Sequence, residues 1–178
     1  MIDDVLDFWF RQIEPKQWWV SDPAFDAQLR QRFGGLLQSA AQAECHRWRT
    51  NAHGRLAEII VLDQFSRNLH RGTALAFAQD PMALALSQEA IARGALSELN
   101  ANERTFLLMP HMHSESRVIH ALAEGLFKEY APASNHDFEL RHKAIIDRFG
   151  RYPHRNAILG RASTAEEIQF LKQPGSTF

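Results

Sequence analysis

The chemically versatile side chains of the sequence gather in three segments, centred on Asp63, His113 and Arg155. In the first segment, Asp63 lies inside an otherwise apolar helical pattern. A buried carboxylate is costly unless a cation or a hydrogen-bond donor pairs with it. Two arrangements are consistent with this segment. Asp63 pairs with an arginine as a structural ion pair, or Arg67 and Asn68 reach into a polar pocket.

The second segment surrounds His113, just after a proline that separates two helical patterns. A histidine there could act as an acid or a base near neutral pH, with Glu115 or Asp63 orienting its ring. The alternative is a histidine that caps a helix or is buried in hydrogen bonds. The catalytic candidates are therefore His113, Glu115 and Asp63.

Pairs of histidine and glutamate in this region also have a spacing that could hold a metal ion. His111 and Glu115 lie four residues apart, as do His120 and Glu124, which places each pair on one face of a helix. Neither pair belongs to an established ligand motif, and nine histidines produce such pairs by chance. We therefore expect no metal and no other cofactor.

The third segment is a Gly/Pro-shaped, arginine-rich loop that leads to the amino terminus of a helix. Arginine forks, free amides and hydroxyls at a helix start suit a phosphate or a carboxylate, although no glycine-rich phosphate loop is present. The competing interpretation is a structural ion network with Asp63, Asp147 and Glu115. The candidate ligand-binding residues are Arg67, Asn68, Arg151, His154, Arg155, Asn156, Arg161, Ser163 and Thr164.

The three segments are expected to converge in the folded chain. Residues 61–67 and 145–151 share a pattern in which an apolar helix carries an acidic residue, ends in an aromatic residue and is followed by arginine. If the two helices pack as neighbours, their arginine-rich ends meet at one end of the bundle. Asp63 would find its cationic partner there, beside His113.

The elements that must position these segments are all helical. Apolar residues repeat at spacings of three and four, and alternating strand patterns are absent. We expect about eight helices in a compact antiparallel array. They cover residues 3–13, a helix starting at 22–23, residues 55–65, a helix from 80 that Gly94 stops, a helix capped by Asn100 and Glu103, residues 114–130, residues 135–149, and a last helix from 163–164.

Composition limits the classes of partner. The 178 residues carry a formal charge of -1 and are 45% hydrophobic, which predicts one domain over residues 1–178 without a basic surface for nucleic acid. No segment has the roughly 18 apolar residues of a membrane span, and the amino terminus is acidic. With Cys45 as the single cysteine, we expect a cytoplasmic protein without membrane partners.

The sequence also resembles a largely bacterial family known as domain of unknown function 924, within the tetratricopeptide-like helical superfamily. The matching stretches are Phe8-Trp9-Phe10, Leu62-Asp63-Gln64-Phe65, Arg67-Asn68, Met109-Pro110, His113-Ser114-Glu115, Phe149-Gly150-Arg151, Pro153-His154-Arg155-Asn156, Leu159-Gly160-Arg161 and Ser163-Thr164 with Glu166-Glu167. His111 and Ser66 depart from the family pattern. The resemblance implies a compact array of antiparallel helices and transfers no activity.

Two functions remain open at this point. The first is a site for a small anion bearing phosphate or carboxylate, which either binds the anion alone or acts on it by hydrolysis or proton transfer through His113. The second is a non-catalytic helical adaptor that binds a peptide or a second copy of the chain. A closed polar pocket would favour the first function, and an open apolar groove the second.

Overall fold

The computed structural model describes residues 1–177, which form ten α-helices and no β-strand. The prediction of an all-α fold is therefore confirmed. The helices are α1 (Ile2–Asp7), α2 (Pro23–Ala41), α3 (Ala52–Ile60), α4 (Ser66–Leu69), α5 (Asp80–Ala92), α6 (Ala95–Glu98), α7 (Ala101–Met112), α8 (Arg117–Tyr130), α9 (Ala133–Phe149) and α10 (Ala165–Phe170). None of these helices is long and apolar enough to cross a membrane.

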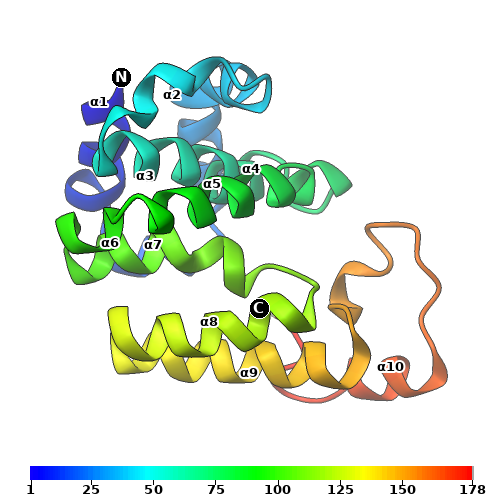
Figure 1. Cartoon of the computed structure of the whole chain (residues 1–178). Helices are drawn as coiled ribbons and strands as arrows, with labels where there is room; N and C mark the ends of the chain where they lie inside the picture. The colour runs from blue at the N-terminus through cyan, green and yellow to red at the C-terminus, as the bar shows by residue number, and fades with distance from the viewer. Residues whose placement is uncertain (178) are drawn as a thin grey trace.

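The helices stack around α3, which packs against α1, α5 and α7 (Figure 1). Short loops join α7, α8 and α9, and α8 packs against both of its neighbours. The loop after α9 and the short helix α10, in orange and red, lie at the end of the α8–α9 pair where α8 begins and α9 ends (Figure 1). Because α9 packs against α8 and α7, α7 lies between α9 and α3. The helices that contain residues 61–67 and 145–151 were expected to pack as neighbours. In the fold they do not, because α7 separates them.

Capping residues start three of the helices where the sequence predicted. The Asp22 carboxylate accepts hydrogen bonds from Ala24 N (2.9 Å) and Phe25 N (3.3 Å) and begins α2. Asn100 and Glu103 cap α7 reciprocally, and Thr164 and Glu167 do the same for α10. These bonds satisfy amides that have no partner inside the helix.

The helix over residues 55–65 is longer than predicted and contains a wide turn. The helix begins at Ala52, passes through a π-helical turn at Val61–Phe65 and continues as α4 to Leu69. A π turn inserts one extra residue into a helix and is common at functional sites. The apolar pattern of residues 56–65 continues across the turn without a break, so no change in the pattern marks it.

Pro110 does not separate two helices. Helix α7 continues through Pro110 to Met112, and α8 begins only at Arg117, where Ser116 provides the cap. The proline removes only the bond to the Phe106 carbonyl, and His113 N still reaches Met109 O at 3.0 Å. The break predicted at Pro110 therefore occurs after His113.

The main core takes most of its buried side chains from α2, α3 and α7, and others from α1, α5, α6 and α8. Ile60 and Trp9 are buried within it, and the Trp9 ring contacts Phe65 and Phe106 at centroid distances of 5.6 Å and 5.5 Å. A second, smaller cluster joins Ile145, Ile146 and Tyr152 to Phe149 and Phe170 beneath the arginine-rich loop. The three candidate segments meet between these two clusters.

Candidate functional site

Asp63 sits in the π-helical turn, where its carboxylate is completely buried. It accepts hydrogen bonds from Gln64 Nε2 (2.6 Å) and Arg67 Nη1 (3.1 Å) and contacts His113 Nδ1 at 2.8 Å. Burial alone would raise the pKa of Asp63, but the charge of Arg67 and the contact with His113 outweigh it and hold the pKa well below its usual range. Asp63 is therefore ionised at neutral pH.

His113 follows the last residue of α7, and its side chain is 12% exposed. Burial and the charge of Arg67 lower the pKa of His113, although Asp63 opposes them, so the ring is neutral at pH 7. The ring nitrogen that faces a carboxylate must carry the proton, which assigns Nδ1 as the donor to Asp63. Nε2 is left as an acceptor at the cavity described below.

Asp80, at the start of α5, connects two arginines that are far apart in sequence. Its oxygens accept from Arg67 Nη1 (2.9 Å) and Nη2 (3.1 Å), and one of them lies 3.4 Å from Arg155 Nη1. A continuous chain of contacts thus runs from His113 through Asp63, Arg67 and Asp80 to Arg155. The structure brings together all three segments that the sequence had singled out.

The guanidinium of Arg155 is held between two aromatic rings. Its central carbon lies 4.5 Å from the centroid of Phe77 and 4.6 Å from that of Tyr152. The side chain is only 7% exposed, and its buried Nε–H has no hydrogen-bond partner among the described residues. Burial lowers the pKa of Arg155, but a guanidinium stays charged in proteins. An unsatisfied, charged donor is thus left at this point.

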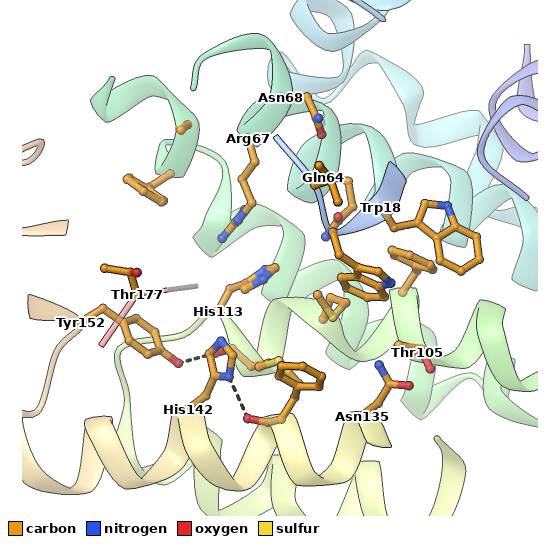
Figure 2. A pocket seen from close by; sticks show the side chains of 18 of the residues that line it. Trp18, Gln64, Arg67, Asn68, Thr105, His113, Asn135, His142, Tyr152 and Thr177 are labelled. Atoms are coloured by element: carbon orange, nitrogen blue, oxygen red, sulfur yellow. Dashed lines mark hydrogen bonds between the residues drawn. The ribbon is translucent and has the colours of Figure 1, made fainter. Parts of the chain in front are cut away.

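Arg67, His113 and Arg155 line a cavity of about 910 Å³ (Figure 2). Three of the lining residues are arginines, and no aspartate or glutamate is found among those in residues 1–177. Asp63 and Asp80 bind the arginines from outside the lining. The lining residues are Trp18, Trp19, Val20, Gln64, Arg67, Asn68, Arg71, Gly72, Ala76, Phe77, Asn102, Thr105, Phe106, Met109, Met112, His113, Pro132, Ser134, Asn135, Phe138, His142, Tyr152, His154, Arg155, Ile158 and Thr177.

Tyr152 and His142 form one wall of the cavity and are fixed by backbone carbonyls. The Tyr152 hydroxyl donates to Met112 O (2.5 Å), and His142 Nδ1 donates to Phe138 O (2.8 Å), as the dashed lines in Figure 2 show. Burial raises the pKa of Tyr152 and lowers that of His142 to about 3. Both groups are neutral at physiological pH, so the charged side chains on the lining are the arginines, each of which is paired with an aspartate behind it.

Comparison with known proteins assigns the chain to a family. Residues 5–175 match the family described as "Bacterial protein of unknown function (DUF924)". The chain belongs to this family. A solved structure of a protein of unknown function from Agrobacterium tumefaciens is 37% identical and superimposes with a TM-score of 0.92, covering 96% of each chain. No curated protein matches the sequence.

Several candidate ligand residues of this DUF924 chain lie outside the cavity and bind protein groups instead. Arg151 is paired with Glu167, and Thr164 caps α10. Asn156 donates to Ser163 Oγ at 3.0 Å and accepts from Arg161. The bonds of Asn156 lie within the arginine-rich loop, and the Arg151–Glu167 pair joins this loop to α10. Of the predicted ligand residues, Arg67, Asn68, His154 and Arg155 line the cavity.

Glu115 does not contact His113. Its carboxylate accepts from Arg161 Nη1 (2.6 Å) and Nη2 (2.9 Å) and from Tyr152 N (2.7 Å). Burial would raise the pKa of Glu115, but these bonds and the charge of Arg161 lower it. Glu115 therefore holds the arginine-rich loop in place, and Asp63 is the carboxylate that orients His113.

The two histidines considered as metal ligands contact other groups in the fold. His120 contacts Glu139 at 2.7 Å, and the buried His111 lies against Ser87. Within residues 1–177, no group of three or more histidine, cysteine, aspartate or glutamate side chains is placed to hold a metal ion.

Sequence reasoning missed the roles of Asp80, Phe77 and His142. Asp80 was identified only as a helix start, and nothing local to it indicates two arginine partners. His142 shares the buried face of α9 with Ile145 and Ile146, at spacings of three and four. That periodicity was the available signal that His142 points inward.

Proposed function

We propose that the cavity binds a small organic anion through a phosphate or carboxylate group, and that His113 transfers a proton to or from it. The observation that supports this most directly is the pair of guanidinium groups, those of Arg67 and Arg155, on a cavity lining that holds no carboxylate among the described residues. Guanidinium groups bind anionic oxygens through charge-assisted hydrogen bonds, and the contact of Arg155 with its carboxylate partner Asp80 is long, at 3.4 Å. Arg67 lies beside Arg155, linked through Asp80.

His113 supplies the proton-transfer part of the proposal. Its neutral ring presents Nε2 as an acceptor, while Asp63 holds Nδ1–H and stabilises the charged ring that forms when a proton is taken up. The reaction class is hydrolysis, with water as the group that is deprotonated, or proton transfer within the bound anion.

Anion binding is tested by thermal unfolding with inorganic phosphate or acetate, against chloride at matched ionic strength. A ligand that prefers the folded state raises the melting temperature by mass action. The wild type should show this rise, and Arg155→Gln should lose most of it. Arg148→Gln is the matched control, because Arg148 is half exposed and bound to Glu166 away from the cavity. Equal shifts in all three proteins, or no shift in the wild type, would overturn the anion site.

Proton transfer is tested with a panel of aryl phosphate and aryl carboxylate esters. His113→Asn should lower any turnover about 10²–10⁴-fold, the usual contribution of a general acid or base. Turnover that survives this substitution undiminished would remove His113 from the reaction. Turnover by neither protein would leave a binding site without catalysis.

A second candidate function is an adaptor that associates with a peptide or with itself. Val118 and Leu122 are 71% and 56% exposed, and they lie one turn apart on α8. Sedimentation of the wild type and of a Val118→Glu, Leu122→Glu double variant tests self-association through this face. A wild-type monomer would remove the self-association form of the adaptor.

The broader expectations also stand as proposals. They are that residues 1–178 act as one domain, that the family falls within the tetratricopeptide-like superfamily, and that the protein works in the cytoplasm. Cys45 supports the last of these, because it is a free, buried thiol. Cell fractionation followed by immunoblotting would test the location.

A further inference from the structure

The cavity is much larger than a simple anion. At about 910 Å³ it has the volume of roughly 30 water molecules at about 30 Å³ each. Inorganic phosphate or acetate would occupy only a small part of it. Pockets of this size usually bind an organic molecule. The cavity therefore has room for an organic body attached to the anionic group.

One end of the cavity is walled by aromatic rings. Figure 2 shows Trp18 on one side of the view and Tyr152 on the other, with Arg67 and His113 between them. The Trp18 ring is 5.0 Å from Phe106 and nearly perpendicular to it, and Trp18 Nε1 donates to Trp9 O at 2.9 Å. This bond fixes the Trp18 ring, so its surface is ready before any ligand arrives.

Trp19 adds a second ring to this wall, and its exposure lacks a structural reason. It stacks on Phe106 with an interplanar angle of 12°, yet it remains 55% exposed. A large aromatic side chain on the lining of a cavity gains from covering by another apolar group. Trp18, Trp19 and Phe106 together are called the aromatic wall.

We propose that the ligand is an aromatic organic anion, whose carboxylate or phosphate binds Arg155 beside His113 and whose ring packs on the aromatic wall. This inference rests on the proposed anion site and adds the chemical class of the rest of the ligand. A planar ring is favoured over an alkyl chain because aromatic pairs gain beyond the buried area. That gain corresponds to about 2- to 10-fold in affinity.

The test compares three carboxylates that differ only in their body: acetate, cyclohexylacetate and phenylacetate. Binding is measured by calorimetry and by quenching of tryptophan fluorescence. Phenylacetate should bind more tightly than cyclohexylacetate by about 2- to 10-fold. Cyclohexylacetate should in turn bind more tightly than acetate, because it buries more apolar surface.

Two substitutions separate the ring from the anion. Trp19→Leu should abolish the preference for phenylacetate over cyclohexylacetate and leave the phosphate-induced rise in melting temperature. Because Trp19 is 55% exposed, the variant should fold normally. Trp48→Leu is the matched control, since Trp48 lies outside the cavity lining. Arg155→Gln should weaken all three carboxylates.

The outcomes distinguish this inference from the proposed function. Equal affinity for phenylacetate and cyclohexylacetate, or a preference that Trp19→Leu leaves unchanged, would overturn the aromatic ligand while the anion site stands. Phenylacetate binding that Arg155→Gln leaves intact, without any effect of phosphate on the wild type, would overturn the anion site instead. Binding of none of the carboxylates, nor of phosphate, would overturn both.

Discussion

The Nδ1 atom of His113 lies 2.8 Å from a carboxylate oxygen of Asp63, which is 50 positions earlier in the chain. The π turn that carries Asp63 and the end of α7 that carries His113 are thereby joined. Because Arg67 and Gln64 bind the same carboxylate, Asp63 cannot turn away from the imidazole. The orientation of the ring is set before any ligand binds.

We predict that His113 is neutral at pH 7 and carries its proton on Nδ1. The carboxylate of Asp63 requires a donor, while burial lowers the pKa of the ring. Long-range ¹⁵N–¹H NMR distinguishes the two tautomers and the charged form. His142, whose Nδ1 donates to Phe138 O, should show the same tautomer and serves as an internal comparison. A proton on Nε2 of His113 would contradict the assigned orientation.

The sequence predicted the meeting of Asp63 with basic residues because burial imposes a requirement. A carboxylate in an apolar helix needs partners, and arginines are concentrated after the helices that contain residues 61–67 and 145–151. Helix starts were predictable for a similar reason, since Asp22 and Asn100 satisfy amides of their own helices. Both inferences depend on the chemical requirements of residues that are close in sequence, and these requirements can be read from the sequence itself.

The partners of Asp80 and the shape of the cavity depend on how helices pack, and local chemistry does not contain that information. Asp80 meets Arg155 across 75 positions, through a loop whose path is set by the bonds of Glu115 to Arg161 and Tyr152. Glu115 was a candidate partner of His113 because the two are close in sequence. In the segment between α7 and α8, the Glu115 side chain instead binds Arg161 and Tyr152 of the arginine-rich loop.

Stability should fall as the pH falls from neutral to about 5. Burial lowers the pKa of His111 to about 4 and that of His142 to about 3, both below the ordinary value of 6.5. The unfolded chain therefore takes up protons first, so this contribution is complete above pH 6.5 and is lost on acidification. Each buried histidine should cost about 1–2 kcal/mol by about pH 5.

Urea unfolding across this range measures the effect. His142→Gln should flatten the dependence of the free energy of unfolding on pH, because it removes one group that charges on unfolding. His46→Gln, at an exposed position, is the matched control and should leave the slope unchanged. Identical slopes for the wild type and His142→Gln would show that His142 is not buried in its neutral form.

The central helix should be sensitive to loss of volume. Ile60 in α3 is fully buried, so Ile60→Ala removes packed methyl groups and leaves a cavity, at a cost of about 2–4 kcal/mol. Ile168→Ala in α10 deletes the same atoms from a side chain that is 47% exposed, and it should change stability by less than about 0.5 kcal/mol. Chemical denaturation of both variants provides the comparison. Similar losses at the two sites would contradict the central position of α3.

Two glycines in helices should respond oppositely to alanine. A Cβ atom added at Gly54, in the first turn of α3, would clash with the carbonyl oxygen of Trp48. That atom belongs to the backbone and cannot rotate away, so Gly54→Ala must displace the turn at Glu44–Thr50 or the start of α3. A cost of about 1–3 kcal/mol, typical of overpacking, is expected.

Gly35, in the interior of α2, has no heavy atom within 4 Å of the added Cβ. Gly35→Ala should therefore stabilise the protein by about 0.5–1 kcal/mol, because alanine loses less backbone entropy in a helix. Urea melts of both variants give the two free energies under the same conditions. A neutral or stabilising effect of Gly54→Ala would mean that Trp48 and α3 are further apart than described. The carbonyl of Trp48 would then no longer restrict the start of the helix that leads to Asp63.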